Sequence, residues 1–178
     1  MTRKPHPLAK VYGLIEPGPV VLVTTARAGR SNVMTLSWHT MLEFEPARVG
    51  CVVSDRNYSF ETLKMTKECV INIPTVEMAA TVVDCGNTTG ASIDKFQKFG
   101  LTALPASEVG PPLIKECFAN LECRVADMTM VPKYCLFVLE VVKAWIDPTV
   151  MDPRTLHHLG NGEFMVAGER IKLNSKMK

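Results

Sequence analysis

A run of six residues, Ser54-Asp-Arg-Asn-Tyr-Ser59, carries the side chains with which proteins bind anions. Arg56 supplies a cation, and Ser54 and Ser59 supply hydroxyl groups. Asn57 is the predicted N-cap of a helix over roughly residues 58–66. A phosphate group binds to hydroxyls, a cation and the free N–H groups at a helix start. The ordinary alternative is a capped helix with a solvated arginine, and this segment taken alone favours that alternative.

A second group of candidates lies on a predicted strand over residues 31–38, which alternates polar and apolar side chains. Asn32, Thr35 and Ser37 could provide polar contacts to a ligand. Met34 and Trp38 could provide apolar packing, although such residues are more often part of a core. Trp38 stands beside His39 at the strand end, where a rim position is expected.

Lys95 and Phe164 are further candidates with structural alternatives. Lys95 lies on a helix predicted over residues 93–99, capped by Ser92 and ended by Gly100, where a solvent-facing lysine is equally expected. Phe164 lies in a predicted hairpin over residues 164–171 around Gly168, where an aromatic side chain could belong to the core.

Cysteine and histidine residues give weaker signals. The six cysteines form no CxxC pair, and most lie in apolar runs, so they are expected to be buried free thiols. Cys85, beside Gly86, is the exception expected to be exposed. His157 and His158 have no further ligands at metal-binding spacing, so no metal site is predicted.

The pattern of elements predicts a single domain over residues 1–178, mainly β with a few short helices. Apolar β-branched runs predict strands, and two long stretches over 117–128 and 134–145 favour a barrel of mostly antiparallel strands. Helices are predicted at 58–66, 76–83 and 93–99.

The composition excludes several classes of protein. With 47% hydrophobic and 21% charged residues, the chain is not of the disordered type. A net charge of +2, with basic residues gathered only at the two ends, does not indicate nucleic-acid binding. No apolar run reaches membrane-spanning length, and the first residues are not a secretory signal, so a cytoplasmic location is expected.

Six segments follow one another in a recognisable order: Gly29–Trp38, Pro46, Cys51–Ser59, Cys69–Pro74, Ser92–Phe96 and Gly100–Thr102. Together they resemble the flavin reductase-like family of FMN-binding split barrels. The resemblance covers roughly residues 17–168, and the chain is most similar to flavoredoxin-type members. Ser59 stands where members of the family often have Thr.

The resemblance implies a split β-barrel, usually a homodimer, with bound FMN. It implies that Lys95 lies near the flavin, where its charge would stabilise the anionic reduced ring or the phosphate. The implied cofactor-binding residues are Asn32, Met34, Thr35, Ser37, Trp38, Ser54, Arg56, Asn57, Ser59, Lys95 and Phe164. No side chain is required as a catalytic acid or base.

Four functions remain open after this comparison. The first expectation is an NAD(P)H-dependent flavin reductase that passes a hydride from nicotinamide to flavin N5. The second is a flavoredoxin-like electron carrier with a protein redox partner. The others are flavin storage without turnover and a dimer that has lost the cofactor, against which Asn32, Trp38, Arg56 and Lys95 argue.

Overall fold

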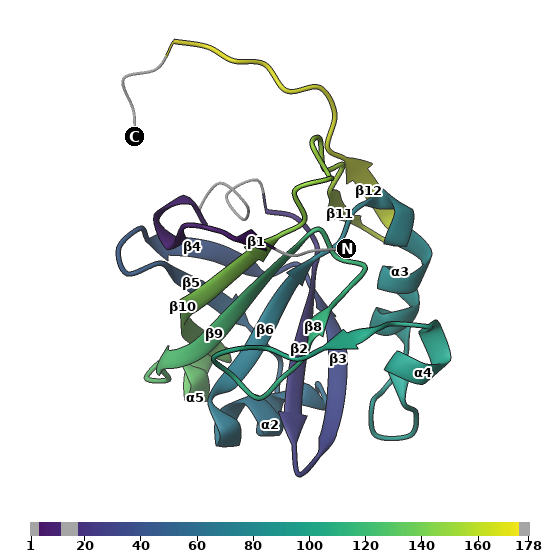
Figure 1. The fold of residues 1–178 in the computed structure, drawn as a ribbon. Coiled ribbons are helices and arrows are strands. Elements are labelled where there is room, and N and C mark those ends of the chain that lie inside the picture. The colour runs from purple at the N-terminus through teal and green to yellow at the C-terminus, as the bar shows by residue number, and fades with distance from the viewer. Residues whose placement is uncertain (1–3, 12–17, 175–178) are drawn as a thin grey trace.

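Figure 1 shows a computed structural model that describes residues 4–11 and 18–174. The basic ends noted in the sequence lie partly outside the described residues, at positions 1–3 and 175–178. Among the described residues, no helix has both the length and the apolar composition needed to span a bilayer.

One large antiparallel sheet forms the frame of the fold. Its strands follow the order β3-β2-β6-β9-β10-β5-β4, with β1 paired to β10. The bounds are β1 (Lys4–Pro5), β2 (Val21–Arg27), β3 (Arg30–Leu36), β4 (His39–Glu43), β5 (Arg48–Val52), β6 (Glu68–Ile73), β9 (Ala119–Asp127) and β10 (Leu136–Ile146). The two long strands predicted for the second half of the chain are therefore confirmed as β9 and β10.

The sheet curls around a core on its inner face. Val21 and Met34 come from β2 and β3 at one end of the sheet, and Val49 and Cys51 come from β5 at the other end, yet all four belong to one buried cluster. A flat sheet of this width could not bring its two ends together. The predicted mainly β split-barrel fold is confirmed.

Short helices and small strand pairs cover the outer face near β2 and β3 (Figure 1). A second buried cluster joins Leu22 and Val33 of the sheet to Val82, Ile114 and Leu156 of these covering segments. The covering segments are η2 (Val76–Met78), α3 (Ala79–Asn87), α4 (Lys95–Phe99), β7 (Ala103–Leu104), β8 (Leu113–Ile114), β11 (Leu156–Gly160) and β12 (Glu163–Val166). The other short helices are η1 (Leu8–Lys10), α2 (Ser59–Thr66) and α5 (Val131–Tyr134), and the last two pack Phe60, Leu63 and Val131 into the inner cluster.

The predictions of one turn and one helix cap in the second half of the chain were wrong. The C-terminal hairpin turns at Asn161-Gly162, where φ is 49° and 78°, rather than around Gly168. Helix α4 is capped by Asp94, whose side chain accepts a hydrogen bond from Gln97 N, rather than by Ser92. Gly100 ends this helix in the left-handed region, as predicted.

The cysteines are all free, and all but Cys135 are buried. Cys85 was expected to be exposed, but it lies on the buried face of α3 and belongs to the outer cluster. Burial raises the pKa of its thiol to about 11, although nearby Lys95 acts to lower it. A redox-active thiolate at Cys85 is not supported, because a reactive cysteine needs a lowered pKa.

A buried polar network ties the loop around β8 to the sheet. Asn72 Oδ1 accepts hydrogen bonds from Ile114 N at 2.9 Å and from Asn120 Nδ2 at 2.8 Å. Thr24 Oγ1 donates to Pro112 O at 2.6 Å. These bonds satisfy polar groups that would otherwise be costly to bury.

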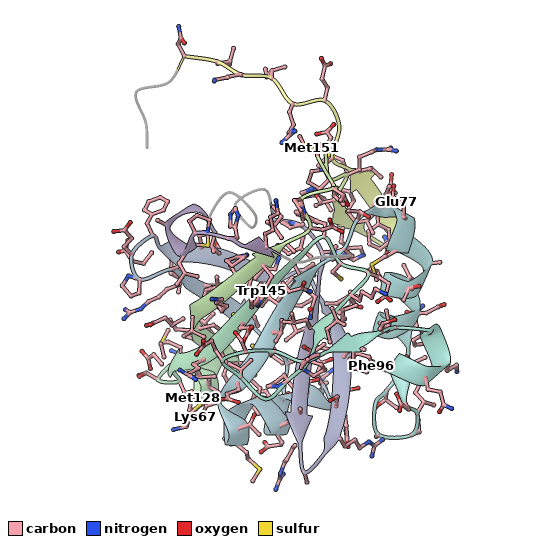
Figure 2. The ribbon with its side chains drawn as sticks, viewed as in Figure 1. Lys67, Glu77, Phe96, Met128, Trp145 and Met151 are labelled. Atoms are coloured by element: carbon pink, nitrogen blue, oxygen red, sulfur yellow. The ribbon has the colours of Figure 1, made fainter. Side chains whose placement is uncertain are left out.

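Glu122 anchors the same loop from β9. Its carboxylate, fully buried, accepts bonds from Trp145 Nε1 at 2.7 Å and Glu108 N at 2.6 Å, and from both the backbone N–H and the hydroxyl of Ser107. Trp145 is labelled in Figure 2. Burial acts to raise the pKa of Glu122, but these donors outweigh it and hold the pKa below its usual range.

Replacing Glu122 with Gln is expected to lower the free energy of unfolding by about 2–3 kcal/mol, because an amide cannot satisfy all these donors. The depressed pKa means that the ionised carboxylate stabilises the fold above pH about 4.3 and stops doing so as pH falls through the folded-state pKa. Urea unfolding between pH 3 and 7 should therefore show a shallower acid slope for Glu122→Gln.

Glu140→Gln is the matched control, because the Glu140 carboxylate lies in an exposed ion pair with Arg48, at 3.9 Å. It should change stability by less than about 0.5 kcal/mol. Equal effects of the two substitutions would contradict the anchoring role of Glu122.

Candidate functional site

A hollow of about 640 Å³ lies between the tip of the β2–β3 hairpin and the loop that precedes α2. Three arginines face it, Arg27, Arg30 and Arg56, together with the two carboxylates Asp55 and Glu61. The other lining residues are Thr25, Ala28, Asn32, Asn57, Tyr58 and Thr62. The charged side chains around the cavity carry an excess of positive charge, which suits an anionic group.

The hairpin turn places two of these arginines. Ala28 and Gly29 both have positive φ, at 50° and 78°, which makes a tight two-residue turn between β2 and β3. Arg27 and Arg30 are paired directly across this turn. The register of the hairpin thus brings both guanidinium groups to the cavity, a consequence that the sequence reading missed.

The start of α2 forms the opposite wall. Asn57 was predicted to cap this helix, but the N-cap residue is Tyr58 and no side chain caps the helix. Asn57 faces the cavity instead. The first turn of a helix has N–H groups without intrahelical acceptors, so an uncapped start beside three arginines is suited to binding an anion.

Ser59, the first residue of α2, is tied to both strands of the hairpin. Its hydroxyl accepts a hydrogen bond from Asn32 Nδ2 at 2.9 Å, and Thr25 Oγ1 lies 3.3 Å away. All three side chains are buried. The structure therefore brings together Asn32 and Ser59, which the sequence reading placed in separate groups, and adds Thr25, which it missed. Ser54 shapes the preceding loop, where its Oγ accepts a hydrogen bond from Arg56 N at 3.3 Å.

The loop after α3 closes onto this corner through Gly90. A Cβ atom at Gly90 would overlap the Asn32 amide oxygen and lie 2.9 Å from Tyr58 Cδ1. Arg30 Nη2 donates to Gly90 O at 2.7 Å, and its guanidinium lies 5.6 Å from the centre of the Tyr58 ring. Glycine is needed here because the backbone approaches Asn32 too closely for any side chain.

Lys95 lies beneath this loop and is almost fully buried. Its Nζ donates to Cys85 O in the last turn of α3 at 2.6 Å, where a cation is favoured. Burial lowers its pKa, although Cys85 acts in the opposite direction. Lys95 is thus not the solvent-facing lysine that the sequence also allowed. It does not line the cavity either.

A second, smaller cavity of about 290 Å³ is lined by three more of the predicted cofactor-binding residues. Thr35, Ser37 and Phe164 line it, from β3, the residues after β3, and β12. His158 also lines it, with its ring centre 5.1 Å from that of Phe164. Thr35 Oγ1 is already bonded to Val82 O at 2.6 Å.

Met34 and Trp38 lie in opposite environments. Met34 is buried in the inner core, where the sequence analysis also allowed it to be, whereas Trp38 is 71% exposed at a rim. His157 is buried and lies 3.0 Å from Thr155 Oγ1 through Nε2. No group of three His, Cys, Asp or Glu side chains suited to a metal ion occurs in the part of the chain that the structure describes.

A family model described as "Flavin reductase like domain" matches residues 14–163. The chain belongs to the flavin reductase-like family. Relatives include the Escherichia coli (strain K12) protein YddH, 33% identical over 172 residues, which covers 89% of this chain and 91% of the relative. A Pyrococcus abyssi protein, PYRAB12460, is 34% identical over 131 residues, covering 74% and 75%.

Solved structures of this family have the same fold. An FMN-binding domain of a flavin reductases-like enzyme from Shewanella baltica is 27% identical, with a TM-score of 0.91 over 97% of this chain and 98% of that one. A flavoredoxin from Methanosarcina acetivorans is also 27% identical, with a TM-score of 0.75 over 89% of each chain.

Gly90→Ala tests the packing at this corner. The added methyl group must displace Asn32 and weaken its bond to Ser59, so we expect the free energy of unfolding to fall by about 1–3 kcal/mol. Chemical denaturation measures the change. Gly168→Ala is the control, because a Cβ there would meet nothing within 4 Å. If both variants were as stable as the parent, the close approach of the loop to Asn32 would be wrong.

Proposed function

We propose that this protein is an FMN-dependent oxidoreductase that binds the FMN phosphate in the cavity beside α2. The proposal rests on one observation: Arg27, Arg30 and Arg56 line the same cavity as the start of that helix, which no side chain caps. A phosphate dianion is well matched to guanidinium groups and free backbone N–H donors. The FMN-binding domain from Shewanella baltica supports FMN as the cofactor.

The residues of β3 suit the rest of the cofactor. Asn32 lines the phosphate cavity, whereas Thr35 and Ser37 line the smaller hollow beside Phe164. Asn32 and Thr35 lie roughly 10 Å apart along β3 and point to opposite faces of it. Because β3 is an edge strand, the ribityl chain in this proposal passes around that edge from one cavity to the other. In this proposal Thr35 and Ser37 meet the polar edge of the ring system, and Phe164 and exposed Trp38 provide apolar contact.

When bound, FMN supplies a ring that accepts a hydride or single electrons. The contribution of the chain is to bind the phosphate, to hold the ring against its partner and to exclude water. We propose NAD(P)H as the hydride donor, so that the protein acts as a flavin reductase. We also propose that it is cytoplasmic and a homodimer.

A second candidate is an electron carrier that exchanges electrons with a protein partner. The similarity to the Methanosarcina acetivorans flavoredoxin and the exposed indole of Trp38 favour it. Fast oxidation of NADH or NADPH with free FMN would support the reductase. Tight FMN with slow nicotinamide oxidation and fast electron exchange with a ferredoxin would support the carrier.

Arg56→Ala is expected to weaken FMN binding by about 1–3 kcal/mol, or roughly 5- to 150-fold in Kd, through loss of a charge-assisted phosphate contact. Quenching of flavin fluorescence measures Kd. Riboflavin, which lacks the phosphate, should bind the variant and the parent equally well.

Arg48→Ala removes an arginine that faces Glu140, away from the cavity, and should leave both affinities unchanged. Trp38→Ala should weaken FMN and riboflavin alike, because the expected contact is with the ring. Unchanged FMN affinity in both Arg56→Ala and Trp38→Ala would remove these two assignments.

A further inference from the structure

A third cavity, of about 400 Å³, lies between α2 and α5, which sit at the same end of the sheet (Figure 1). Its apolar lining includes Phe60, Met128, Val131 and Pro132. Met128 is labelled in Figure 2. Phe60 and Val131 are buried members of the inner cluster, so they form a fixed apolar floor. A cavity with such a floor suits a flat, weakly charged ring.

This apolar cavity adjoins the arginine-lined cavity beside α2, because Asp55 and Glu61 line both of them. Both carboxylates are exposed, and Glu61 Oε1 lies 3.8 Å from Lys64 Nζ. A carboxylate repels a phosphate, so these two side chains do not favour the FMN phosphate. The hydroxyl groups of a ribose, by contrast, donate hydrogen bonds to carboxylates. The boundary between the two cavities is therefore suited to a sugar.

The arginine-lined cavity is larger than one phosphate group requires. Its volume of about 640 Å³ corresponds to roughly twenty water molecules. Three guanidinium groups face it, from Arg27, Arg30 and Arg56, whereas a phosphate dianion is balanced by two. A diphosphate has enough charge and enough oxygen atoms to engage all three.

We propose that the two adjoining cavities form one site for an adenosine diphosphate group, so that the chain binds FAD as well as FMN. The diphosphate lies among the arginines, the ribose hydroxyls donate to Asp55 and Glu61, and the adenine packs against Phe60 and Val131. This inference rests on the proposed function, because the second phosphate continues from the flavin phosphate in the arginine-lined cavity.

The order of the three surfaces selects this ligand. Cationic, acidic and apolar linings follow one another from the loop before α2 to α5. An adenosine diphosphate group has its diphosphate, its sugar and its base in the same order. A second inorganic phosphate would use only the first surface and would leave the other two without a partner.

Calorimetric titration of the full chain with FAD and with FMN tests the inference. FAD should bind about tenfold more tightly or better, because the sugar and the base add contacts to those of the flavin. If FMN binds and FAD binds no more tightly, the adenosine site is wrong and the proposed function stands. If neither flavin binds, both proposals fail.

Glu61→Ala separates the two ligands. It should weaken FAD binding about tenfold through loss of the ribose contact, and FMN should bind as tightly as before or more tightly, because a negative charge leaves the surroundings of its phosphate. The side chain is 65% exposed, so folding should not change. Glu140→Ala, at the ion pair with Arg48, is the control and should affect neither flavin. An equal loss for FAD and FMN in Glu61→Ala would overturn the ribose contact.

Cys135 reports on the apolar cavity directly, because it lines that cavity and the other five cysteines are buried. Saturating FAD should slow alkylation of this thiol by a maleimide about tenfold or more. Saturating FMN should leave the rate unchanged, since FMN ends at its phosphate. Cys135→Ser should abolish the labelling and so identify the thiol. Equal alkylation rates with the two flavins would show that the adenine does not occupy this cavity.

Discussion

The hydrogen bond from Asn32 Nδ2 to Ser59 Oγ, 2.9 Å long, is the contact on which the geometry of the site depends. It joins β3 to the first residue of α2, two segments separated by two further strands along the chain. Because the bond is buried, neither group can exchange it for water, so breaking it would leave polar atoms unsatisfied. The hairpin arginines and the start of α2 consequently face each other across one cavity.

The loop at Gly90 reinforces this arrangement from outside. Since β3 is an edge of the sheet, its outer side needs cover, and the loop provides it through the bond from Arg30 and the close contact with Asn32. Arg30 is therefore both a wall of the cavity and a tie to the loop. The polar network of Asn72, Asn120 and Glu122 holds a different loop and is not part of the cavity.

Strand positions were largely predictable from the sequence, because buried strands such as β2 and β6 are runs of β-branched residues that no helix pattern explains. The hairpin at Asn161-Gly162 was also predictable in principle, since Asn-Gly is a strong turn signal, but it was overlooked in favour of Gly168. The uncapped start of α2 was not predictable, because Asn57 is a good N-cap by type and only the tertiary structure shows that it faces the cavity instead.

The residues of the candidate site could also be predicted only in part. Arg56, Asn57, Ser59 and Asn32 could be selected by residue type and by resemblance, and the structure brings them to one corner. Arg27 and Arg30 were missed because their role depends on the register of the hairpin, which places them opposite one another. The burial of Lys95 was equally hidden, since it depends on how α4 packs against the end of α3.

Equilibrium dialysis against FMN shows whether this chain holds the cofactor, because dialysis detects both tight and exchangeable FMN. If FMN binds as proposed, the protein side will contain an excess of flavin that approaches one FMN per chain, with absorption bands at roughly 375 and 450 nm. Equal flavin concentrations on the two sides, at protein and FMN concentrations up to the millimolar range, would contradict it.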